Sequence, residues 1–322
     1  MDFQLNDDQQ ALVSALQSIL QDHTNIPQDS KLDFFWHDAD LQEQLEANGF
    51  LDAARDMGPL EAALVVHETA KLVSTTDTLG RGLVAPLSCP EHEFSGAVAL
   101  VEKAHIGRAI RNLPIAKHIL IADGRDVLVL DTKALAVKPV ESILAFPYGC
   151  LETTPDLSSA VRITGAGETM KKWWRVGLAA EITGAAMGAI EFTTEYVTQR
   201  EVFGRPVGSF QSVQHRMVKR YGYARSGYFL AMRAAWSGTE TDAAIAAAHA
   251  QSGLRDLLFD LHQFNGGMGM TTEHLIHFWL YRARALQAEA GGQSAASLEI
   301  SDRRWGAEDN ALSEPLLSKV IA

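Results

Sequence analysis

The segment REVFGRPVGSFQ, at residues 200–211, carries three side chains that could bind a phosphorylated nucleotide. Arg200 presents a planar guanidinium, which matches pyrophosphate oxygens with paired hydrogen bonds. Phe203 offers an apolar plate, and Gln211 offers an amide that both donates and accepts. These residue types around a turn with two glycines and a proline indicate an anion or nucleotide clamp. A plain connection between two helices, with Arg200 in solvent, is the other interpretation, because Gly and Pro are ordinary turn residues.

A second glycine-rich segment, HQFNGGMGM, occupies residues 262–270. Gly266, Gly267 and Gly269 would let a ligand approach the main chain, because glycine has no Cβ. A glycine-terminated helix end explains the same pattern without a ligand. The spacing is not G-x-G-x-x-G after a strand, so the context excludes a Rossmann dinucleotide site.

Other residue types that bind metals or perform redox chemistry lack the required spacing. Glu273, His274 and His277 form E-H-x-x-H, whereas the zinc-protease signature places the glutamate between its two histidines. We predict no metal site there. Cys89 and Cys150 follow no C-x-x-C or metal spacing, and two isolated thiols suit a structural role in a reducing compartment.

The residues ahead of these segments predict a helical unit over 1–87. Asn6 and Gln9 have the spacing of a capping box, in which each side chain bonds the other residue's main chain. Asn48-Gly49 is a suitable stop for the amphipathic segment LQEQLEANGF. Pro59 stands at a favoured helix start.

A small β unit is predicted over 88–168. Four β-branched segments, SGAVALVEK, HILIADG, DVLVLDT and LAVKPVES, are separated by turn residues. The sequence ADGRD, at residues 122–126, predicts a hairpin between the second and third of them.

Residues 169–322 predict a four-helix bundle. The first helix, about 171–200, is apolar on nearly every side and should therefore be buried. We expect the second helix to start with Ser209 as its N-cap. The third should run from about Thr241 to Phe264, and the fourth should start near Thr272.

The two glycine-rich segments, in the order helix, R-x-x-F-G-x-x-x-G-x-F-Q, helix, helix, Q-x-x-G-G-x-G, helix, resemble the C-terminal bundle of the acyl-CoA dehydrogenase family. The opening DFQLNDDQQALVSAL is similar to that family's first helix. The likeness covers most of the chain and is strongest over 171–285. It implies a mainly α fold with a reduced central β unit between the N-terminal α domain and the bundle. It also implies FAD bound across a dimer interface, with the flavin ring on one subunit and the adenosine diphosphate half on its neighbour.

The resemblance assigns cofactor contacts to matching residues of this chain. Arg200 would contact the pyrophosphate, and Phe203 would pack on the adenine end. The remaining contacts it implies are Val207, Phe210, Gln211, Gln263, Phe264 and Gly267.

The catalytic glutamate of the family does not carry over. One family position for this base falls on Trp174, which cannot remove a proton. The other falls on Ala290 or Gly291, with Glu289 beside it as a possible substitute. The family's stretches that cradle the flavin ring, Thr-Glu-Pro-x-Ala-Gly-Ser-Asp and Trp-Ile-Thr, are not found between residues 86 and 168.

The resemblance therefore favours the short, catalytically incomplete subunit of a heteromeric acyl-CoA dehydrogenase, of the kind found in bacterial steroid side-chain degradation. Such a subunit would be inactive alone. It would share FAD with a longer partner in a heterodimer or heterotetramer that oxidises an acyl-CoA and passes electrons to an electron-transfer flavoprotein. Two alternatives stay open. The chain is a self-sufficient homo-oligomer with Glu289 as its base, or a non-catalytic helical scaffold that has lost its flavin.

Charge and hydropathy exclude other classes of function. The formal net charge is −12 over 322 residues, which disfavours nucleic acid and anionic membranes as partners. The N-terminus MDFQLNDDQQ has no secretory pattern, and no apolar run reaches the roughly 18 residues of a membrane span. We expect a cytoplasmic protein.

Overall fold

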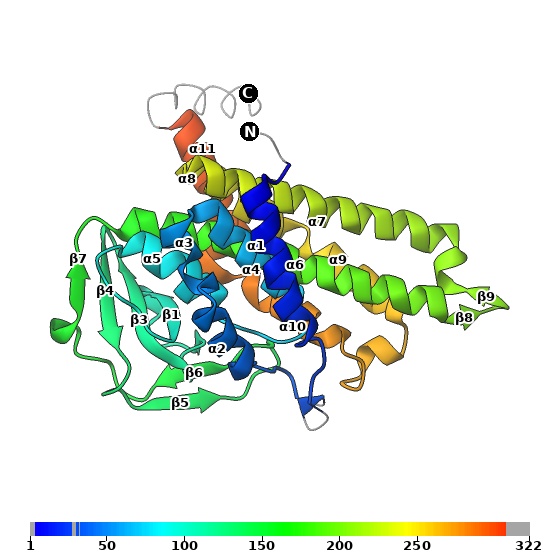
Figure 1. Cartoon of the computed structure of the whole chain (residues 1–322), viewed down its shortest axis with the longest axis horizontal. Helices are drawn as coiled ribbons and strands as arrows, with labels where there is room; N and C mark the ends of the chain where they lie inside the picture. Colours follow the sequence, from blue (N-terminus) through cyan, green and yellow to red (C-terminus); the bar gives the residue numbers. More distant parts are fainter. Residues whose placement is uncertain (1–3, 28–29, 32, 307–322) are drawn as a thin grey trace, which may run out of the picture.

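The computed structural model describes residues 4–27, 30–31 and 33–306, and it is mainly helical with a small β unit at one end (Figure 1). This is the fold class that the sequence predicts. The N-terminal elements, with η for 3-10 or π turns, are α1 (Asp7–Gln21), α2 (Ala39–Ala47), η2 (Phe50–Asp52), α3 (Ala53–Asp56), α4 (Pro59–Ala70), η3 (Thr78–Val84) and α5 (Ala85–Ser88).

Local sequence rules set the ends of these first helices. The Asn6 side chain accepts from the Gln9 amide at 2.8 Å, and the Asn6 amide donates to the Gln9 side chain at 3.1 Å. Helix α2 ends at Asn48, followed by Gly49 in a left-handed conformation, and Pro59 is the first residue of α4. The predicted capping box, stop and start are therefore confirmed.

Two small sheets form the β unit. One has the strand order β1-β3-β4-β7 and the other β2-β6-β5. The strands are β1 (Ala97–Glu102), β2 (Ile110–Arg111), β3 (Ala116–Asp123), β4 (Asp126–Asp131), β5 (Val137–Val140), β6 (Tyr148–Leu151) and β7 (Val161–Ile163). The predicted hairpin joins β3 to β4 and turns at Gly124. Strands β2, β6 and β7 were not predicted, because two to four residues are too few to show an alternating pattern.

The C-terminal unit is built around one long buried helix. Its helices are α6 (Gly167–Gln199), α7 (Gln211–Ser237), α8 (Glu240–Ser252), α9 (Leu254–Asn265), α10 (Ile276–Leu286) and α11 (Gly292–Trp305). Helix α6 packs against α4, α7, α8 and α10, which explains why it is apolar on most sides. At Gly184 and Gly188 the neighbouring backbone comes so close that a Cβ would lie 2.2 Å from a carbonyl oxygen.

The prediction of one helix over residues 241–264 was wrong. The chain breaks at Gly253 between α8 and α9. The ring of Tyr223, on α7, lies where a Cβ at residue 253 would be, and its hydroxyl donates to the Ala250 carbonyl. This ring therefore packs against the chain at the break, a contact that the sequence of the segment alone does not reveal.

Two helix starts also differ from the predictions. Ser209 is not an N-cap, because its hydroxyl donates to the Pro206 carbonyl at 2.7 Å and α7 begins two residues later. Helix α10 begins at Ile276 rather than near Thr272. With α11 added, the described part of this unit has six helices instead of four uninterrupted ones.

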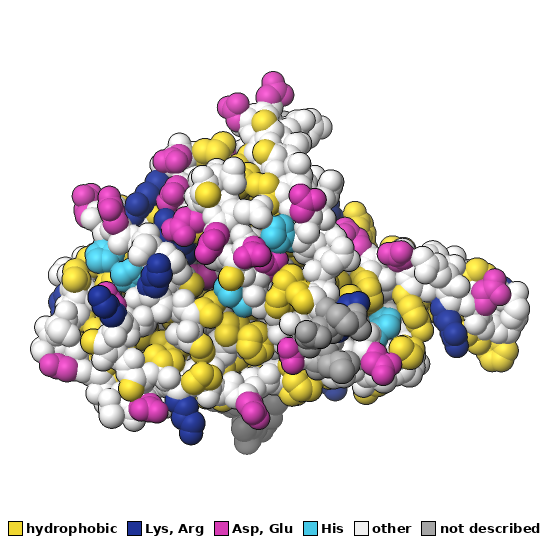
Figure 2. Space-filling view, turned by 60° about the horizontal axis from the view of Figure 1, so that its bottom comes forward, with side chains coloured by type: hydrophobic (Ala, Val, Ile, Leu, Met, Phe, Trp, Pro, Cys, Tyr) yellow, Lys and Arg dark blue, Asp and Glu magenta, His cyan; other side chains and the backbone are white. Residues whose placement is uncertain are grey.

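A short hairpin, β8 (Glu201–Val202) and β9 (Arg205–Pro206), joins α6 to α7 through η6 (Val207–Ser209). It lies at the end of the molecule opposite the β unit (Figure 1) and projects from the main body (Figure 2). Helix α6 has 33 residues, about 50 Å, so it connects these two ends. None of the helices in the described ranges is long and apolar enough to cross a membrane.

Candidate functional site

A cavity of about 690 Å³ lies at the hairpin end, between the end of α6, the start of α7 and the end of α9. It brings together both glycine-rich segments, which are about 60 residues apart in the sequence. Six of the predicted cofactor contacts line it: Arg200, Val207, Phe210, Gln263, Phe264 and Gly267.

The first wall is positioned by the way α6 ends. Arg200 leaves the helix with an extended backbone, although its amide still bonds the Tyr196 carbonyl at 2.9 Å. The Arg200 carbonyl accepts from the Val207 amide at 2.8 Å, which closes the hairpin. Phe210 is covered on one face by the Arg205 guanidinium, 4.0 Å from the ring centre. The hairpin connection thus fixes Arg200 and the Phe210 ring on one side of the cavity.

The second wall is the end of α9. Gly266 stops the helix with a positive φ of 60°, and neither Gly266 nor Gly267 has an atom within 4 Å of the place where a Cβ would lie. Asn265 is fully buried and donates to Thr193 at 2.9 Å, but its Oδ1 has no partner among the described residues. The open glycines and this unpaired acceptor are features that a bound ligand could complete.

The lining of this cavity is positively charged, although the protein as a whole is acidic. Arg200 and Arg216 both line it, and none of its lining residues in the described part of the chain is acidic. The sequence analysis missed Arg216. The available signal was its position three residues after Val213 and four after Ser212, which places all three on one face of α7.

Two predicted contacts lie outside the cavity lining. Phe203 sits at the tip of the hairpin with 92% of its surface exposed and a positive φ of 53°. Gln211 is the first residue of α7 and is exposed. Neither helps to form the cavity within one chain.

The two places where the resemblance looks for a base meet at the other end of α6. The Trp174 indole donates to Glu289 Oε2 at 3.3 Å. Glu289 begins the η8 turn (Glu289–Gly291), and Ala290, Gly291 and the following Gly292 all have positive φ. This reversal of the chain aims Glu289 towards the β unit rather than along a helix. Glu289 is thus the acid that the fold places beside Trp174.

Glu289 is held in a buried ion-pair cluster. Arg111, on β2, pairs with Glu289 Oε1 at 2.8 Å and with Glu181, on α6, at 2.9 Å. The Arg111 guanidinium also lies 4.6 Å from the centre of the Phe146 ring. Arg111, Glu289 and Tyr148 line a cavity of about 340 Å³ between the β unit and η8.

The electrostatic environment shifts the pKa values of Glu289, Arg111 and Tyr148 in this cavity. Burial raises the pKa of the Glu289 carboxyl, and the Arg111 guanidinium offsets only part of that effect. Burial by itself would lower the pKa of Arg111, but the two carboxylates raise it above its ordinary value. Burial, with a smaller contribution from Glu289, also raises the pKa of Tyr148. A carboxylate that a guanidinium and an indole both hold must leave this pair before it can act as a base.

The residues of the E-H-x-x-H segment do not converge. His274 packs against the rings of Phe192 and Tyr196, and His277 Nδ1 bonds the His274 carbonyl at 2.9 Å. Within the described ranges, no group of three or more His, Cys, Asp or Glu residues could hold a metal ion.

Comparisons with known proteins agree with this architecture. A family model, Acyl-CoA dehydrogenase, C-terminal domain, matches residues 168–305. Acyl-CoA dehydrogenase IpdE2 of Mycolicibacterium smegmatis is 30% identical over 235 residues, which cover 69% of this chain and 72% of that protein. Acyl-CoA dehydrogenase FadE34 of Mycobacterium tuberculosis is 32% identical over 197 residues, 58% of this chain and 27% of that protein.

Solved structures share the fold at lower identity. The ChsE4–ChsE5 complex of Mycobacterium tuberculosis aligns with a TM-score of 0.79 at 19% identity, over 95% of this chain and all of that one. A variant of the Tcur3481–Tcur3483 steroid ACAD aligns with a TM-score of 0.73 at 21% identity, over 92% of this chain and 97% of that one.

Proposed function

This chain belongs to the acyl-CoA dehydrogenase family, and on that premise we propose that it is one subunit of a heteromeric, FAD-dependent acyl-CoA dehydrogenase. The cavity at the hairpin end, which Arg200 lines, is called the Arg200 cavity below. In this proposal it binds the adenosine diphosphate half of an FAD whose flavin ring lies on a longer partner subunit. When bound, FAD accepts the hydride that leaves the acyl chain. The residues of this chain hold the cofactor tail and build the subunit interface.

The observation that carries the proposal is the separation of the two cavities along α6. Trp174 and Arg200 are 26 residues apart on that helix, about 39 Å at 1.5 Å per residue. One dinucleotide does not span that distance. This separation supports a cofactor whose tail is held at Arg200 and whose ring lies against another chain.

The residues at the Arg200 cavity fit the diphosphate half of FAD. Two guanidiniums line the cavity and can neutralise a pyrophosphate. Phe210 and Phe264 supply apolar surface, and the bare backbone of Gly266 and Gly267 allows close approach. In this proposal each of these groups contributes to binding the cofactor tail, and none of them removes a proton.

The side chain of Trp174 and the contacts of Glu289 favour a partner subunit that supplies the base. Trp174 has no titratable group, and Glu289 is engaged by Arg111 and Trp174 together. In the proposed complex, a carboxylate of the longer subunit removes the α-proton of the acyl-CoA.

One observation favours the self-sufficient alternative. Glu289 lies in a cavity and has a raised pKa, which are properties expected of a general base. If the ion pair with Arg111 opened, a homo-oligomer of this chain would have both a cofactor clamp and a base. The third alternative, a scaffold without flavin, does not explain why two arginines, Arg200 and Arg216, line the Arg200 cavity.

The substrate and the electron acceptor are also proposals. Because the Tcur3481–Tcur3483 neighbour is called a steroid ACAD, we propose a CoA ester of a steroid side chain as the substrate. ChsE4–ChsE5 is a complex of two differently named chains, which supports a heterodimer or heterotetramer here. An electron-transfer flavoprotein is the proposed acceptor.

The experiment is to co-express this chain with candidate longer acyl-CoA dehydrogenase subunits and to measure the mass and flavin content of each complex. We expect one FAD per two different chains and no acyl-CoA turnover by this chain alone. Arg200→Ala should strip FAD from the complex without separating the subunits. Stoichiometric FAD and turnover in the isolated chain would refute the heteromeric proposal.

The same experiment tests the shared site directly. The matched control is Arg233→Ala, because Arg233 is an exposed arginine of α7 that pairs with Asp242 away from the cavity. The control complex should keep its flavin. If the Arg200→Ala complex also keeps all its flavin, this chain does not hold the cofactor tail.

A further inference from the structure

Helix α11 packs against α8 with few buried apolar side chains (Figure 1). Of its residues, all of which the structure describes, Gly292 and Ala296 alone are buried. Leu298 and Trp305 are exposed. A surface helix usually buries a stripe of large apolar residues against the core. Burial of large side chains therefore contributes little to holding α11 in place.

One carboxylate of α11 connects this helix to α6. Glu299 pairs with Lys171 and with Arg175, each at 2.6 Å. Arg303 of α11 donates to Glu299 at 3.1 Å and to Glu168 of α6 at 3.4 Å. Burial alone would raise the pKa of Glu299, but hydrogen bonds from Lys171 and Arg175 lower it to about 2, so the carboxylate is charged at neutral pH. These five residues are called the Glu299 latch below.

The latch has a buried half and a solvated half. Arg175 is 2% exposed, and Glu299 is the one carboxylate of the described residues that pairs with it. Lys171 and Arg303 are partly exposed, so solvent screens their charges. Moving Glu299 away would leave Arg175 as a buried cation without a partner, which favours the closed arrangement.

The chain ahead of α11 has the geometry of a hinge. Ala290, Gly291 and Gly292 have φ angles of 50°, 82° and 68°. Glycine adopts left- and right-handed conformations at similar cost, so Gly291 and Gly292 can absorb a rotation of the helix. Ala290 has a Cβ and is strained in this conformation, so a rotation there would relieve strain.

The hinge and the latch lie beside two neighbouring cavities. Ala290 lines the cavity of about 340 Å³ that contains Glu289. A second cavity, of about 600 Å³, shares the lining residues Trp174 and Ala290 with the first. It is also lined by Lys171 and Glu168, which are ionic partners of α11. These two cavities are called the Trp174 cavities below.

We propose that α11 is a hinged lid, which turns at Ala290–Gly292 and is held shut by the Glu299 latch, so that ionic contacts control access to the Trp174 cavities. Opening would carry Ala290 away from both cavities and leave Lys171 without its carboxylate. The inference does not depend on the proposed function, because it involves neither the Arg200 cavity nor a partner subunit.

The experiment is hydrogen–deuterium exchange of the full chain at low salt and at about 1 M NaCl, where the Debye length is about 3 Å. We expect residues 292–305 to exchange faster at high salt, while α6 and α8 change little. Glu299→Gln should raise the exchange rate of residues 292–305 about 10- to 100-fold at low salt, the effect of losing hydrogen bonds between charged groups. Arg175→Met removes the buried half from the α6 side and should raise exchange in the same residues.

A single thiol reports access to the Trp174 cavities. Ala122, on β3, is half-buried and lines the second of them. In an Ala122→Cys background, alkylation of this thiol by iodoacetamide should become faster when Glu299→Gln is added. Mass spectrometry of the labelled peptide separates this thiol from those of Cys89 and Cys150.

Asp302→Asn is the matched control. Asp302 is exposed on the same helix, three residues after Glu299, and pairs with no cation of the described residues. This variant should leave both exchange and alkylation unchanged. Equal effects of Glu299→Gln and Asp302→Asn, faster exchange spread over α6 and α8, or unchanged alkylation in Glu299→Gln would overturn the inference.

Discussion

Three arginines of this chain differ in how many carboxylates pair with their guanidinium groups. Arg111 is shared between the carboxylates of Glu181 and Glu289, so its charge is already used inside the protein. Arg200 is exposed at the end of α6 and makes no ion pair with any described residue. Arg216 lies between these cases, because it shares a single carboxylate with Arg220. The number of carboxylates around each guanidinium thus separates a structural arginine from two that can bind a ligand.

Glu289→Gln discriminates between the two catalytic alternatives. In the proposed complex we expect acyl-CoA turnover to stay near the wild-type value, because there the partner subunit would supply the base. The folded state should lose some stability, because Arg111 would keep only Glu181. Steady-state kinetics and urea unfolding measure the two effects. A loss of turnover by several orders of magnitude, with flavin still bound, would instead identify Glu289 as the base.

A buried histidine predicts how stability depends on pH. Burial, followed by the nearby charge of Lys71, lowers the pKa of His67 to about 4. The unfolded chain binds this proton near its ordinary pKa of 6.5, so between those values the unfolded state holds more protons than the folded one. The free energy of unfolding should therefore fall as the pH drops from 6.5 towards 4, with His67 contributing about 1–3 kcal/mol.

Urea unfolding of the wild type and of His67→Gln at pH 7, 6, 5 and 4 checks this. The variant should lose less stability on acidification than the wild type. Glu68 and Arg225 also lie near His67, so the comparison is between the slopes of the two proteins rather than their absolute stabilities. Parallel curves would show that His67 is not the source.

At the scale of elements, α6 connects the N-terminal unit and the two cavities. It is buried along most of its length and meets the N-terminal unit at two glycines, where backbone touches backbone. Its first half reaches the Glu289 cavity, and its end carries Arg200. A displacement of this helix would therefore disturb both cavities.

Gly188→Ala tests that close packing. A Cβ there would lie 2.2 Å from the Lys71 carbonyl oxygen, so the helices must separate, at a cost of about 1–3 kcal/mol. The matched control is Gly222→Ala on α7, where a Cβ meets nothing within 4 Å and should stabilise the helix by about 0.5–1 kcal/mol. Chemical denaturation measures both. Equal effects of the two substitutions would contradict the packing described here.

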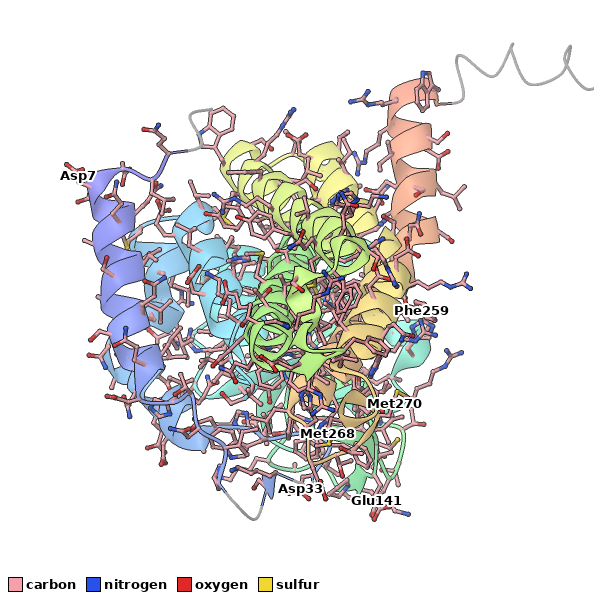
Figure 3. All side chains as sticks on the ribbon, turned by 90° about the vertical axis from the view of Figure 1, so that its right-hand side faces the viewer. Asp7, Asp33, Glu141, Phe259, Met268 and Met270 are labelled. Atoms are coloured by element: carbon pink, nitrogen blue, oxygen red, sulfur yellow. The ribbon has the colours of Figure 1, made fainter. Side chains whose placement is uncertain are left out.

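At the scale of the whole molecule, the hairpin end has the features of an assembly surface. Phe203 exposes 92% of its surface and adopts a left-handed backbone that a bulky residue rarely takes. Met268 and Met270 project at the same end of the molecule, and Phe259 lies on its flank (Figure 3). Exposed apolar groups beside the Arg200 cavity are expected if a second subunit covers it, as in the proposed complex.

Phe203→Ala should therefore weaken assembly with the partner subunit, by about 30-fold if the side chain is an anchor of the interface. The stability of the isolated chain should not fall, because the ring makes little contact within it. The control is Val161→Ala, an exposed apolar residue at the opposite end, on β7. Sedimentation of mixtures with the partner measures the affinity. Undiminished assembly of the Phe203 variant would place the interface elsewhere.

The sequence alone was informative wherever neighbouring residues determine the outcome. The capping box of Asn6 and Gln9, the start at Pro59, the stop at Asn48-Gly49 and the β3–β4 hairpin all depend on contacts within a few residues. The mainly α fold with a small β unit follows from periodicity, which is also a local property. The proposed cofactor contacts could be selected because two short motifs keep a recognisable order and spacing.

Only the tertiary structure decided which residues share a cavity. Residues within 200–216 and 263–268 line one cavity, which includes Arg216. Phe203 and Gln211 lie outside that lining. The predicted third helix is interrupted at Gly253, beside the ring of Tyr223. Arg111 pairs with both Glu181 and Glu289. The physical reason is the same in each case. Such contacts join residues from about 30 to nearly 180 positions apart, and no local pattern encodes which side chains will meet.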